Sequence, residues 1–417
     1  MITRLFFFIL IIFLLDLYLF FGVTPFFHKS HFLNKYLNFF YWIVSLIIYF
    51  IIIYVFLNYE KRTPSIHFNN DIIISSFIFI VFLSKFFALL PIIIDDILRI
   101  FRFLYLFFSN LIGSNVNPST YGISRFEFLQ KTSLFIGSAF FLTFLSGMKF
   151  GRYNFKLKHV KINIKNWSNK IKGLKLVQIS DLHLGGFNSI EKLEEVVNLI
   201  NDQEPDLLVF TGDLVNNYYN EAIPYIETLK KIKSKYGKFS VLGNHDYCDY
   251  VGWKRSSKKW KDNFKNMLSI HKDIGFDLLL DESRQIEING SKFNLVGVEN
   301  WGSKFTKDGD LNKAMKFTDK NLPTILLSHD PSHWTAQVID FPQRIDLQLS
   351  GHTHGMQFGI DIPGIKWSPA KWRYKQWSGL YKDKSISKYI YVNAGIGHLA
   401  YAGRVGIMPE ISVLTIS

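Results

Sequence analysis

The chain has 417 residues, which is enough for a membrane region and one α/β domain of ordinary size. Its 41 Phe and its long apolar runs lie mostly before residue 150, which argues against a wholly water-soluble protein, and its single cysteine, Cys248, excludes an intrachain disulfide. The net charge of +14 favours an anionic partner such as anionic lipid, nucleotide or nucleic acid, although a general bias toward Lys, Asn, Ile and Phe would also produce it.

Membrane-spanning helices are predicted in residues 1–150. Residues 5–21 are apolar except for Asp16 and end without the small-residue cleavage site of a signal peptide, so we expect them to remain as a membrane anchor. Residues 37–57 and 72–94 each reach the about 20 residues that a spanning helix needs. Residues 132–148 form a shorter fourth span.

Charged residues separate and flank these spans. Between the third and the fourth, residues 95–131 interleave Asp and Arg with Phe and Leu, a pattern typical of an interfacial helix. Asp16 is expected to face the bundle interior or the membrane edge. A transport function is not expected, because it would need more charge inside the membrane. Lys and Arg are more frequent near the N-terminus and in the basic linker, residues 151–171, than near the other ends of the spans. We therefore expect a multi-pass membrane protein whose C-terminal domain faces the cytoplasm.

Residues 172–417 are predicted to form one α/β domain. Buried strands are expected at residues 174–179, 206–210, 239–242, 324–327, 346–349, 389–392 and 410–416. Helices are expected at 190–200, 221–235 and 253–275. Asn289-Gly290, between alternating runs at 284–288 and 292–298, indicates a β-hairpin. The predicted fold is α/β, with an N-terminal helical transmembrane region followed by a two-sheet sandwich that carries its helices outside.

Five of the predicted strands lead into short polar motifs. Strand ends in α/β sheets hold ligands because the loops can converge there while the strands keep them rigid. A mixed set of Asp, Asn and His without thiolate supplies enough donors for two divalent ions. The sequence therefore predicts a two-metal site whose ligands are Asp181, His183, Asp213, Asn244, His329, His352 and His354.

The order of these motifs resembles that of the calcineurin-like metallophosphoesterases, whose pattern D-x-H, G-D, G-N-H-D/E, H and G-H-x-H is matched within residues 172–417. Residues 351–357 and 379–381, and Arg404 followed by Pro409-Glu410-Ile411, resemble a membrane-anchored branch that includes pyrophosphatases acting on UDP-diacylglucosamine. Met356 and Ala394 depart from that branch, which commonly has Gly and Arg at these positions. The resemblance implies the two-sheet fold of this family and a metal-dependent hydrolase.

The resemblance also implies the role of each ligand. One ion is expected to be held by Asp181, His183, Asp213 and His354, and the other by Asp213, Asn244, His329 and His352, with Asp213 as the bridge. Two cations so held lower the pKa of a water and neutralise phosphoryl oxygens. Such ligands suit Mn best, with Fe or Zn as alternatives, and suit Mg less well.

Four further residues near the motifs have candidate roles. His245 is assigned protonation of the leaving group or stabilisation of the transition state, with Asp246 fixing its tautomer. Asp246 and Asp330 are equally well explained as solvated loop carboxylates or turn caps. Arg404 is a candidate phosphate clamp, because a planar guanidinium binds phosphate oxygens two at a time, but a surface ion pair would also explain it.

Two aromatic and basic segments bear on the substrate. In the helix predicted at 253–275, an aromatic stripe with Trp253, Trp260 and Phe264 is interleaved with Lys and Arg; such a stripe is more often core packing than membrane contact. Residues 365–377 combine Lys and Arg with Trp, a composition typical of membrane interfaces. If both segments reach the bilayer, they form a lip for a lipid substrate; the aromatic residues of the second are Trp367, Trp372 and Trp377.

The sequence thus favours a membrane-anchored hydrolase with two divalent metal ions that cleaves a phosphodiester or pyrophosphate bond in a lipid-linked substrate. A nucleotide or nucleic-acid phosphodiesterase would use the same chemistry and the positive charge, but membrane anchoring makes nucleic acid a less natural partner. A non-catalytic membrane scaffold that has kept the motifs is the remaining alternative, and the complete ligand set argues against it. The sequence indicates no protein partner.

Overall fold

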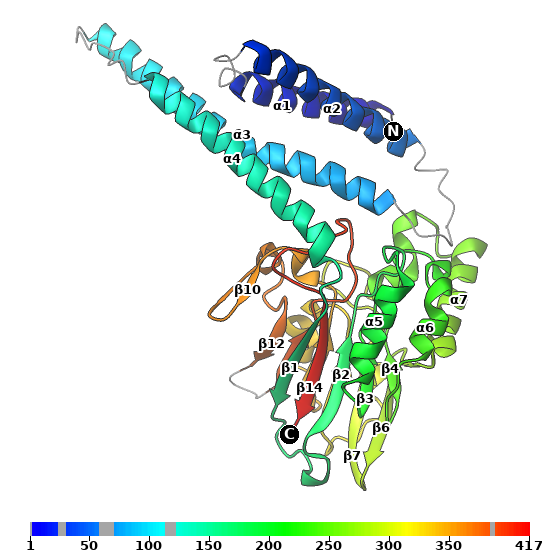
Figure 1. Ribbon diagram of the computed structural model, residues 1–417. Helices are drawn as coiled ribbons and strands as arrows, with labels where there is room; N and C mark the ends of the chain where they lie inside the picture. Colours follow the sequence, from blue (N-terminus) through cyan, green and yellow to red (C-terminus); the bar gives the residue numbers. More distant parts are fainter. Residues whose placement is uncertain (1, 24–30, 58–70, 113–121, 384–387) are drawn as a thin grey trace. The chain divides into compact units, whose positions relative to one another are not determined.

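Four apolar helices, two six-stranded sheets and a two-stranded ribbon dominate the computed structural model, which describes residues 2–23, 31–57, 71–112, 122–383 and 388–417 (Figure 1). The elements divide into two units. The first consists of the described parts of residues 1–63 and 74–145, and the second of residues 146–417 with the described part of 64–73. The first unit is helical and the second is α/β.

The helical unit contains α1 (Ile2–Val23), α2 (His31–Leu57), α3 (Asp71–Leu111) and α4 (Gly122–Ser146). Within the described residues, three stretches are long and apolar enough to cross a membrane: Leu5–Val23, Ile72–Leu111 and Glu127–Gly151. The second helix adds a shorter apolar stretch, Asn38–Tyr54. The predicted membrane region is therefore present as apolar helices.

The separate interfacial helix predicted at residues 95–131 is wrong for its described part. Helix α3 continues unbroken through residues 95–111 and contains Pro91. Asp95 and Arg99 lie one turn apart and form an ion pair of 2.7 Å, so charges that suggested a change of environment satisfy each other along one helix. No Gly or Pro stands between Pro91 and Gly113 to end the helix earlier.

Asp16 lies inside the helical unit, as expected. Its carboxylate is 2.8 Å from the ammonium of Lys85 on α3 and accepts a 2.5 Å hydrogen bond from the hydroxyl of Tyr49 on α2. The Lys85 ammonium also lies 3.0 Å from the hydroxyl of Ser45. Because a lone charge in lipid is costly, this pairing lets α1 and α3 each carry an ionic group within an apolar bundle.

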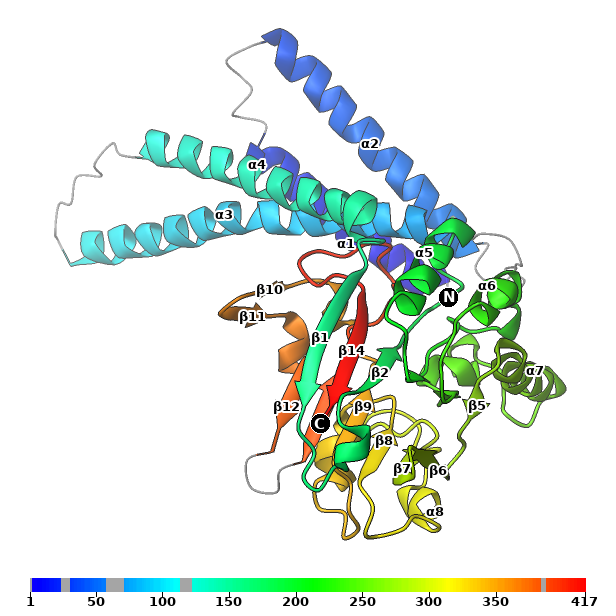
Figure 2. The same cartoon turned by 60° about the horizontal axis from the view of Figure 1, so that its bottom comes forward.

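The second unit is built on two sheets, which appear as separate layers in Figure 2. One sheet has the strand order β1-β14-β2-β3-β4-β5, and the other β12-β13-β9-β8-β7-β6. The bounds of the first sheet's strands are Lys156–Ile162, Glu410–Ile416, Leu174–Ile179, Leu207–Phe210, Lys238–Ser240 and Asp277–Leu278. Those of the second are Gly379–Lys382, Tyr389–Val392, Leu347–Ser350, Thr324–Leu327, Ser291–Gly297 and Glu282–Ile288.

Alternation along the central strands fills two cores. In β2, Leu174 and Leu176 enter the core between the sheets, whereas Val177 and Ile179 face the helical layer. Because both faces of the sheet are buried, these strands are predominantly apolar, and β3 is apolar throughout. The predicted two-sheet sandwich is confirmed, as is the hairpin β6–β7, whose turn residues Asn289 and Gly290 both have positive φ.

Helices cover the outer faces of the sandwich. On the first sheet lie α5 (Ile190–Asn201), α6 (Ile226–Lys230) and α7 (Lys258–Ile274), and α8 (Leu311–Met315) lies by the second (Figures 1 and 2). The helix predicted at 221–235 is too long. Two short 3-10 turns precede α6 there, and Pro224 stands in the second of them, where a missing N–H is tolerated only at a helix start.

Candidate metal centre

The predicted ligands follow strands of both sheets. Strands β2, β3 and β4 are parallel to one another and lead to Asp181 and His183, to Asp213 and to Asn244, respectively. In the other sheet, the parallel strands β8 and β9 lead to His329, and to His352 with His354. Parallel strands end at the same edge of their sheet, so each sheet delivers its own share of the ligands to one place.

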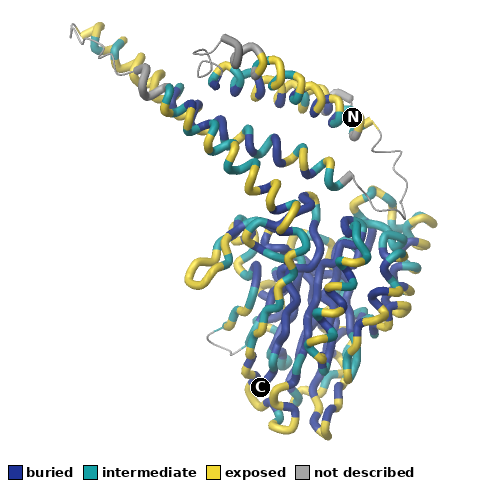
Figure 3. Tube along the Cα trace, in the orientation of Figure 1, coloured by how far each residue is buried: buried dark blue, intermediate teal, exposed yellow. Residues whose placement is uncertain are grey.

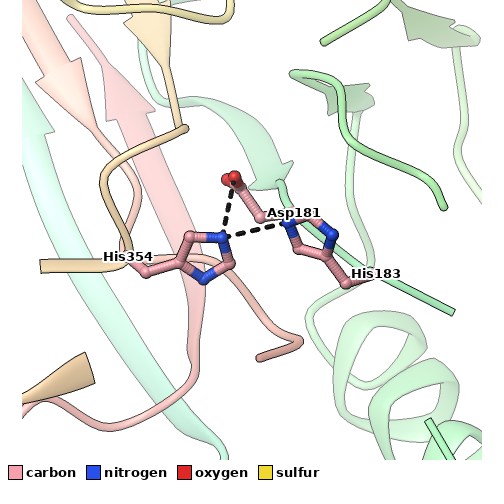
Figure 4. Close-up of side chains that lie close together, drawn as sticks. All are labelled: Asp181, His183 and His354. Carbon is pink, nitrogen blue, oxygen red and sulfur yellow. Dashed lines mark hydrogen bonds and ion pairs between the residues drawn. The ribbon is translucent and has the colours of Figure 1, made fainter. Parts of the chain in front are cut away.

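One cluster consists of Asp181, His183 and His354, all buried (Figure 4). The Nε2 atoms of the two imidazoles lie 3.1 Å apart, and Nε2 of His354 lies 3.3 Å from a carboxylate oxygen of Asp181. Figure 4 shows the side chain of His354, from the loop after β9, facing those of Asp181 and His183, from the loop after β2. Three such donor atoms around one point could hold a divalent ion.

The second cluster consists of Asp213, His329 and His352. Nε2 of His329 lies 3.1 Å from Oδ2 of Asp213 and 3.2 Å from Nδ1 of His352. The same Oδ2 atom of Asp213 is 3.6 Å from Nε2 of His183 in the first cluster. The position of Asp213 between the two clusters fits the bridging role that the sequence predicts.

Asn244 supplies an observation that tests whether metal ions fit this site. Its Oδ1 atom is buried and, among the described residues, has no hydrogen-bond partner, whereas its Nδ2 atom donates to the hydroxyl of Tyr250 over 2.7 Å. A buried amide oxygen without a partner costs free energy unless a ligand satisfies it. A divalent ion beside His329 and His352 would do so, and the donor set fits the two ions predicted.

The backbone at the ligands is unusual in two ways. Five of them have positive φ, between 46° and 72°, a region that non-glycine residues seldom adopt and that concentrates at functional sites: Asp181, His183, Asp213, His352 and His354. Glycines make room beside them. A Cβ on Gly351 would lie 2.3 Å from Oδ2 of Asp181, and one on Gly243 would lie 2.2 Å from Oδ1 of Asp213.

Burial and charge set the protonation of the imidazoles. Burial lowers the pKa of His183 to about 3 and that of His352 to about 4, so both are neutral near pH 7, as a metal ligand must be. Burial would also lower the pKa of His329, but the carboxylate of Asp213 outweighs it and raises that pKa to about 10. Metal binding at the second cluster is therefore expected to release the proton of His329.

Carbonyl, amide and hydroxyl groups behind the ligands fix which imidazole nitrogen faces the site. Nδ1 of His183 lies 3.1 Å from Oδ1 of Asn216, Nδ1 of His329 lies 2.7 Å from the carbonyl of Thr211, and Nε2 of His352 lies 2.8 Å from the hydroxyl of Tyr374. Such partners orient metal ligands. Sequence reasoning missed Asn216 and Tyr374. Asn216 stands three residues after Asp213 in the same loop, which is a usable signal, but nothing in the sequence marks Tyr374.

His245 stands at the edge of the site with one nitrogen engaged. Its Nδ1 atom lies 2.7 Å from the carbonyl oxygen of Asn216, so Nδ1 carries the hydrogen and Nε2 is left to exchange a proton. Its backbone N–H donates to Oδ1 of Asp213 over 2.9 Å. The imidazole ring packs edge-on against His183, with 4.9 Å between the ring centroids. This half-buried position is compatible with the transfer of a proton to a group bound at the metal centre.

The expectation that Asp246 fixes the tautomer of His245 is wrong, because the carbonyl of Asn216 occupies that place. The buried Asp246 carboxylate instead accepts backbone N–H groups of Asp213, Leu214 and Gly243, at 2.8 to 2.9 Å. It therefore joins the loop of the bridging ligand to the loop of Asn244. Asp330 has a mixed position: Oδ1 caps a turn by accepting from the N–H of Ser332, and Oδ2 lies 3.7 Å from Nε2 of His352.

Arg404 does not lie where a phosphate clamp is expected. Its guanidinium is fully buried and donates to the carbonyl oxygens of Ala394, Gly395 and Gly397 at 2.5 to 3.1 Å. Its Nη2 atom also lies 3.2 Å from Nδ1 of His354. Gly397 in turn donates its N–H to the carbonyl of Asp181 over 2.8 Å. The geometry favours a role in holding His354 and Asp181 together over the predicted contact with substrate.

Replacing Arg404 by Met is expected to weaken metal binding about 10- to 100-fold, the usual effect of removing a group that orients a metal ligand. The metal affinity of Arg404→Lys should lie between those of Arg404→Met and the wild type, because one ammonium cannot reach all of these carbonyl groups. Metal content after equilibrium dialysis at graded free Mn²⁺ measures the effect, with the surface change Arg284→Met as control. Unchanged metal affinity together with a raised KM would instead support the predicted role of Arg404 as a phosphate clamp.

Comparisons with known proteins agree with this geometry. Residues 174–356 match the family model "Calcineurin-like phosphoesterase", and residues 3–152 match "Probable Calcineurin-like phosphoesterase, transmembrane domain". The chain is 31% identical over 246 residues to "Uncharacterized metallophosphoesterase YkuE" of Bacillus subtilis, covering 58% of this chain and 79% of that protein.

Two further relatives have names that refer to a transmembrane protein and to a pyrophosphatase, respectively. One is "Transmembrane protein with metallophosphoesterase domain" of Danio rerio, 27% identical over 62% of this chain, which spans only 56% of that protein. The other is "UDP-2,3-diacylglucosamine pyrophosphatase LpxG" of Chlamydia trachomatis, 30% identical over 54% of this chain and 78% of that protein. This chain belongs to the calcineurin-like phosphoesterases and is a metallophosphoesterase with a transmembrane region.

Proposed function

We propose that the protein hydrolyses a phosphodiester or pyrophosphate bond in a lipid-linked substrate, at a centre of two divalent ions beside the membrane. The observation that carries the proposal is the joined pair of ligand clusters around Asp213, in a chain that also contains apolar helices of membrane-spanning length. The similarity to a diacylglucosamine pyrophosphatase supports a lipid-linked substrate.

The ions would be held by Asp181, His183 and His354 on one side and by Asn244, His329 and His352 on the other, with Asp213 between them. When bound, two such ions supply Lewis acidity toward phosphoryl oxygens and lower the pKa of water toward neutrality. The imidazole and carboxylate ligands favour Mn, with Fe or Zn as alternatives.

His245 provides the proton for the leaving group. In the imidazolium form its Nδ1–H is held on the carbonyl of Asn216, and its Nε2–H is the group that can give up a proton toward the site. The backbone contact to Asp213 ties the position of this imidazole to the bridging ligand. General acid catalysis of this kind speeds a reaction by about 10²- to 10⁴-fold.

A substrate panel tests the proposal. Purified full-length protein in detergent is assayed with Mn²⁺, Fe²⁺ or Zn²⁺ against lipid pyrophosphates, lipid phosphodiesters, nucleotides and aryl phosphodiesters. We expect hydrolysis of the aryl phosphodiester and faster hydrolysis of at least one lipid-linked substrate. Preference for nucleotides or nucleic acid over every lipid would contradict the lipid assignment, and loss of all activity with every metal would support a non-catalytic scaffold.

We also propose that the catalytic domain faces the cytoplasm. The basic linker after the last span supports this orientation, because Lys and Arg near spans favour the cytoplasmic side. Cys248 is buried, so a cysteine introduced at the exposed Lys320 can report accessibility. Labelling of Lys320→Cys by a membrane-impermeant maleimide in intact cells would contradict the proposed side.

A further inference from the structure

A two-stranded ribbon projects from the second unit directly after the metal-ligand loop (Figure 1). It consists of β10 (Ile360–Ile362) and β11 (Ile365–Trp367), joined by Pro363-Gly364, with Gly364 at a φ of 83°. Ile360 pairs with Trp367 and Ile362 with Ile365, whereas Asp361 pairs with Lys366. Since cross-strand partners point to the same side, the ribbon has one apolar face and one charged face.

The charged face is the one attached to the protein. Asp361 forms an ion pair of 2.6 Å with Lys158 of β1, and the ammonium of Lys366 donates to the carbonyl of Ser378 over 2.6 Å. These contacts hold the ribbon by its polar residues and turn its apolar residues away from the sandwich. This is the reverse of the usual arrangement, in which a sheet packs its apolar face on the core.

Most residues of the ribbon are exposed, as its colours in Figure 3 show. The exposed fractions are 44% for Ile360, 55% for Ile362 and 55% for Ile365. Trp372, in the short helix after β11, is 75% exposed and its ring centroid lies 6.0 Å from that of Trp367. We call these five residues the ribbon face: Ile360, Ile362, Ile365, Trp367 and Trp372.

The other aromatic residues of the predicted lip are wholly or partly buried. Trp377 is 5% exposed and packs in a small core with Ala370, Ala394 and Ile407. In α7, Trp260 and Phe264 stack on each other, and Phe264 also stacks on Tyr247. Of the two aromatic segments that the sequence singled out, the second therefore carries the strongly exposed apolar residues, whereas Trp253, Trp260 and Phe264 of the first are half-buried.

Charge selects an anionic lipid surface as the partner of this face. Lys371, Arg373 and Lys375 next to Trp372 are all exposed. The one carboxylate within residues 356–382 is Asp361, which is engaged by Lys158. Apolar residues and Trp flanked by Lys and Arg are the composition of segments that lie at the membrane interface, and each cation adds attraction to anionic headgroups.

Continuity with the last apolar stretch supports the same partner. Phe358, at the base of the ribbon, bridges to Val405, and the N–H of Gly359 donates to the carbonyl of Val405 over 2.9 Å. The adjacent N–H of Arg404 donates to the carbonyl of Gly147 over 3.2 Å. Gly147 belongs to the candidate span Glu127–Gly151 and to the same unit as the ribbon. The end of a membrane-spanning stretch is therefore fastened close to the base of the ribbon.

We propose that the ribbon face is a membrane-docking surface that inserts into the interfacial layer of an anionic bilayer and holds the loop of His352 and His354 against the lipid. The loop that carries His352 and His354 leads directly into the ribbon, so lipid headgroups would be presented next to those ligands. The docking itself is independent of which bond is cleaved, but its benefit to catalysis rests on the proposed lipid-linked substrate.

Depth-dependent quenching tests the docking. The full-length chain carrying Ile362→Cys is labelled with nitrobenzoxadiazole and reconstituted in nanodiscs of phosphatidylcholine and phosphatidylglycerol that contain doxyl-labelled lipid. Lys320→Cys, exposed in the loop before β8, is the matched control, and the wild-type chain shows the background from the buried Cys248. We expect strong quenching at position 362 and little at 320. Equal quenching at both positions overturns the proposal.

Kinetics test its consequence. The double change Ile362→Ser and Ile365→Ser is expected to raise the apparent KM for a lipid-linked substrate in mixed micelles by about 10-fold or more, from the loss of buried apolar area. Kinetics on a soluble aryl phosphodiester should stay as in the wild type. Phe317→Ser, a change at an exposed aromatic residue outside the ribbon, should alter neither.

The two experiments separate the two proposals. Quenching at 362 with no lipid hydrolysed by the wild type would leave the docking surface in place and remove the lipid-linked substrate. Absent quenching at position 362 together with rapid lipid hydrolysis would remove the docking surface and keep the lipid-linked substrate. A KM that rises equally for lipid and soluble substrates would show that the ribbon supports the fold of the site, and would count against docking.

Discussion

Asp213→Asn is expected to abolish turnover and to lower the content of both metal ions. The Oδ2 atom of Asp213 is within 3.6 Å of a ligand nitrogen in each cluster, so one substitution weakens both. The neutral amide also removes the negative charge that balances the imidazole of His329 and would balance two cations. Loss of a bridging carboxylate therefore affects assembly of the whole centre.

Metal analysis and thermal unfolding measure this effect. Wild-type protein should bind close to two ions per chain, and added Mn²⁺ should raise its Tm because the ion binds only the folded state. Asp213→Asn should gain little or nothing in Tm. Asp262→Asn, the same chemical change at an exposed position of α7, serves as control. Full occupancy of both sites in Asp213→Asn would refute the bridging assignment.

His245→Ala is expected to reduce kcat by about 10²- to 10⁴-fold while leaving metal content near that of the wild type. The hydrogen bond from residue 245 to the ligand Asp213 comes from the backbone N–H, which alanine keeps. What is lost is the free Nε2 atom, whose partner nitrogen is held by the carbonyl of Asn216. His159→Ala, at an exposed position of β1, controls for the loss of an imidazole elsewhere.

The leaving group decides between roles for His245. A nitrophenolate departs without protonation, so an aryl phosphodiester should hide much of the loss, whereas an alkoxide or a lipid phosphate should reveal it. Equal losses on both substrates would mean that the imidazole stabilises the transition state without donating a proton. Reduced metal content in His245→Ala would show that the imidazole of His245 supports metal binding.

The sandwich and its ligand set could be predicted because each rests on local signals. Buried central strands appear as predominantly apolar runs, and β2, β8, β13 and β14 lie where the runs predicted them. The ligands stand directly after such strands. Local periodicity alone misplaces the ends of helices, because chain breakers decide them. Pro224 shortened the helix predicted at 221–235, and α3 continues through residues 95–111 because no breaker stands there.

Roles that depend on contacts between distant segments could not be predicted. Arg404 has the residue type of a phosphate clamp, and only the fold reveals that its donors are used by carbonyl groups of residues 394–397. Tyr374 contacts His352 although it stands 22 positions later in the chain, beyond the ribbon of β10 and β11. Trp372 and Trp377 belong to one aromatic and basic segment, yet one is exposed and the other is core. The two tryptophans have similar sequence surroundings, and their different exposure follows from how the segment packs.

The ion pair between Asp16 and Lys85 bears on how this protein enters the membrane during synthesis. Asp16 lies in the first helix and its partner in the third, so the carboxylate emerges from the ribosome long before the ammonium that satisfies it. A carboxylate in the centre of a helix costs about 2.5–3.5 kcal/mol at insertion. We therefore expect the first helix to be held in lipid by its flanking apolar residues, and then by the hydroxyl of Tyr49 on α2, until α3 brings Lys85, so that truncation before Lys85 would leave the carboxylate without its cation.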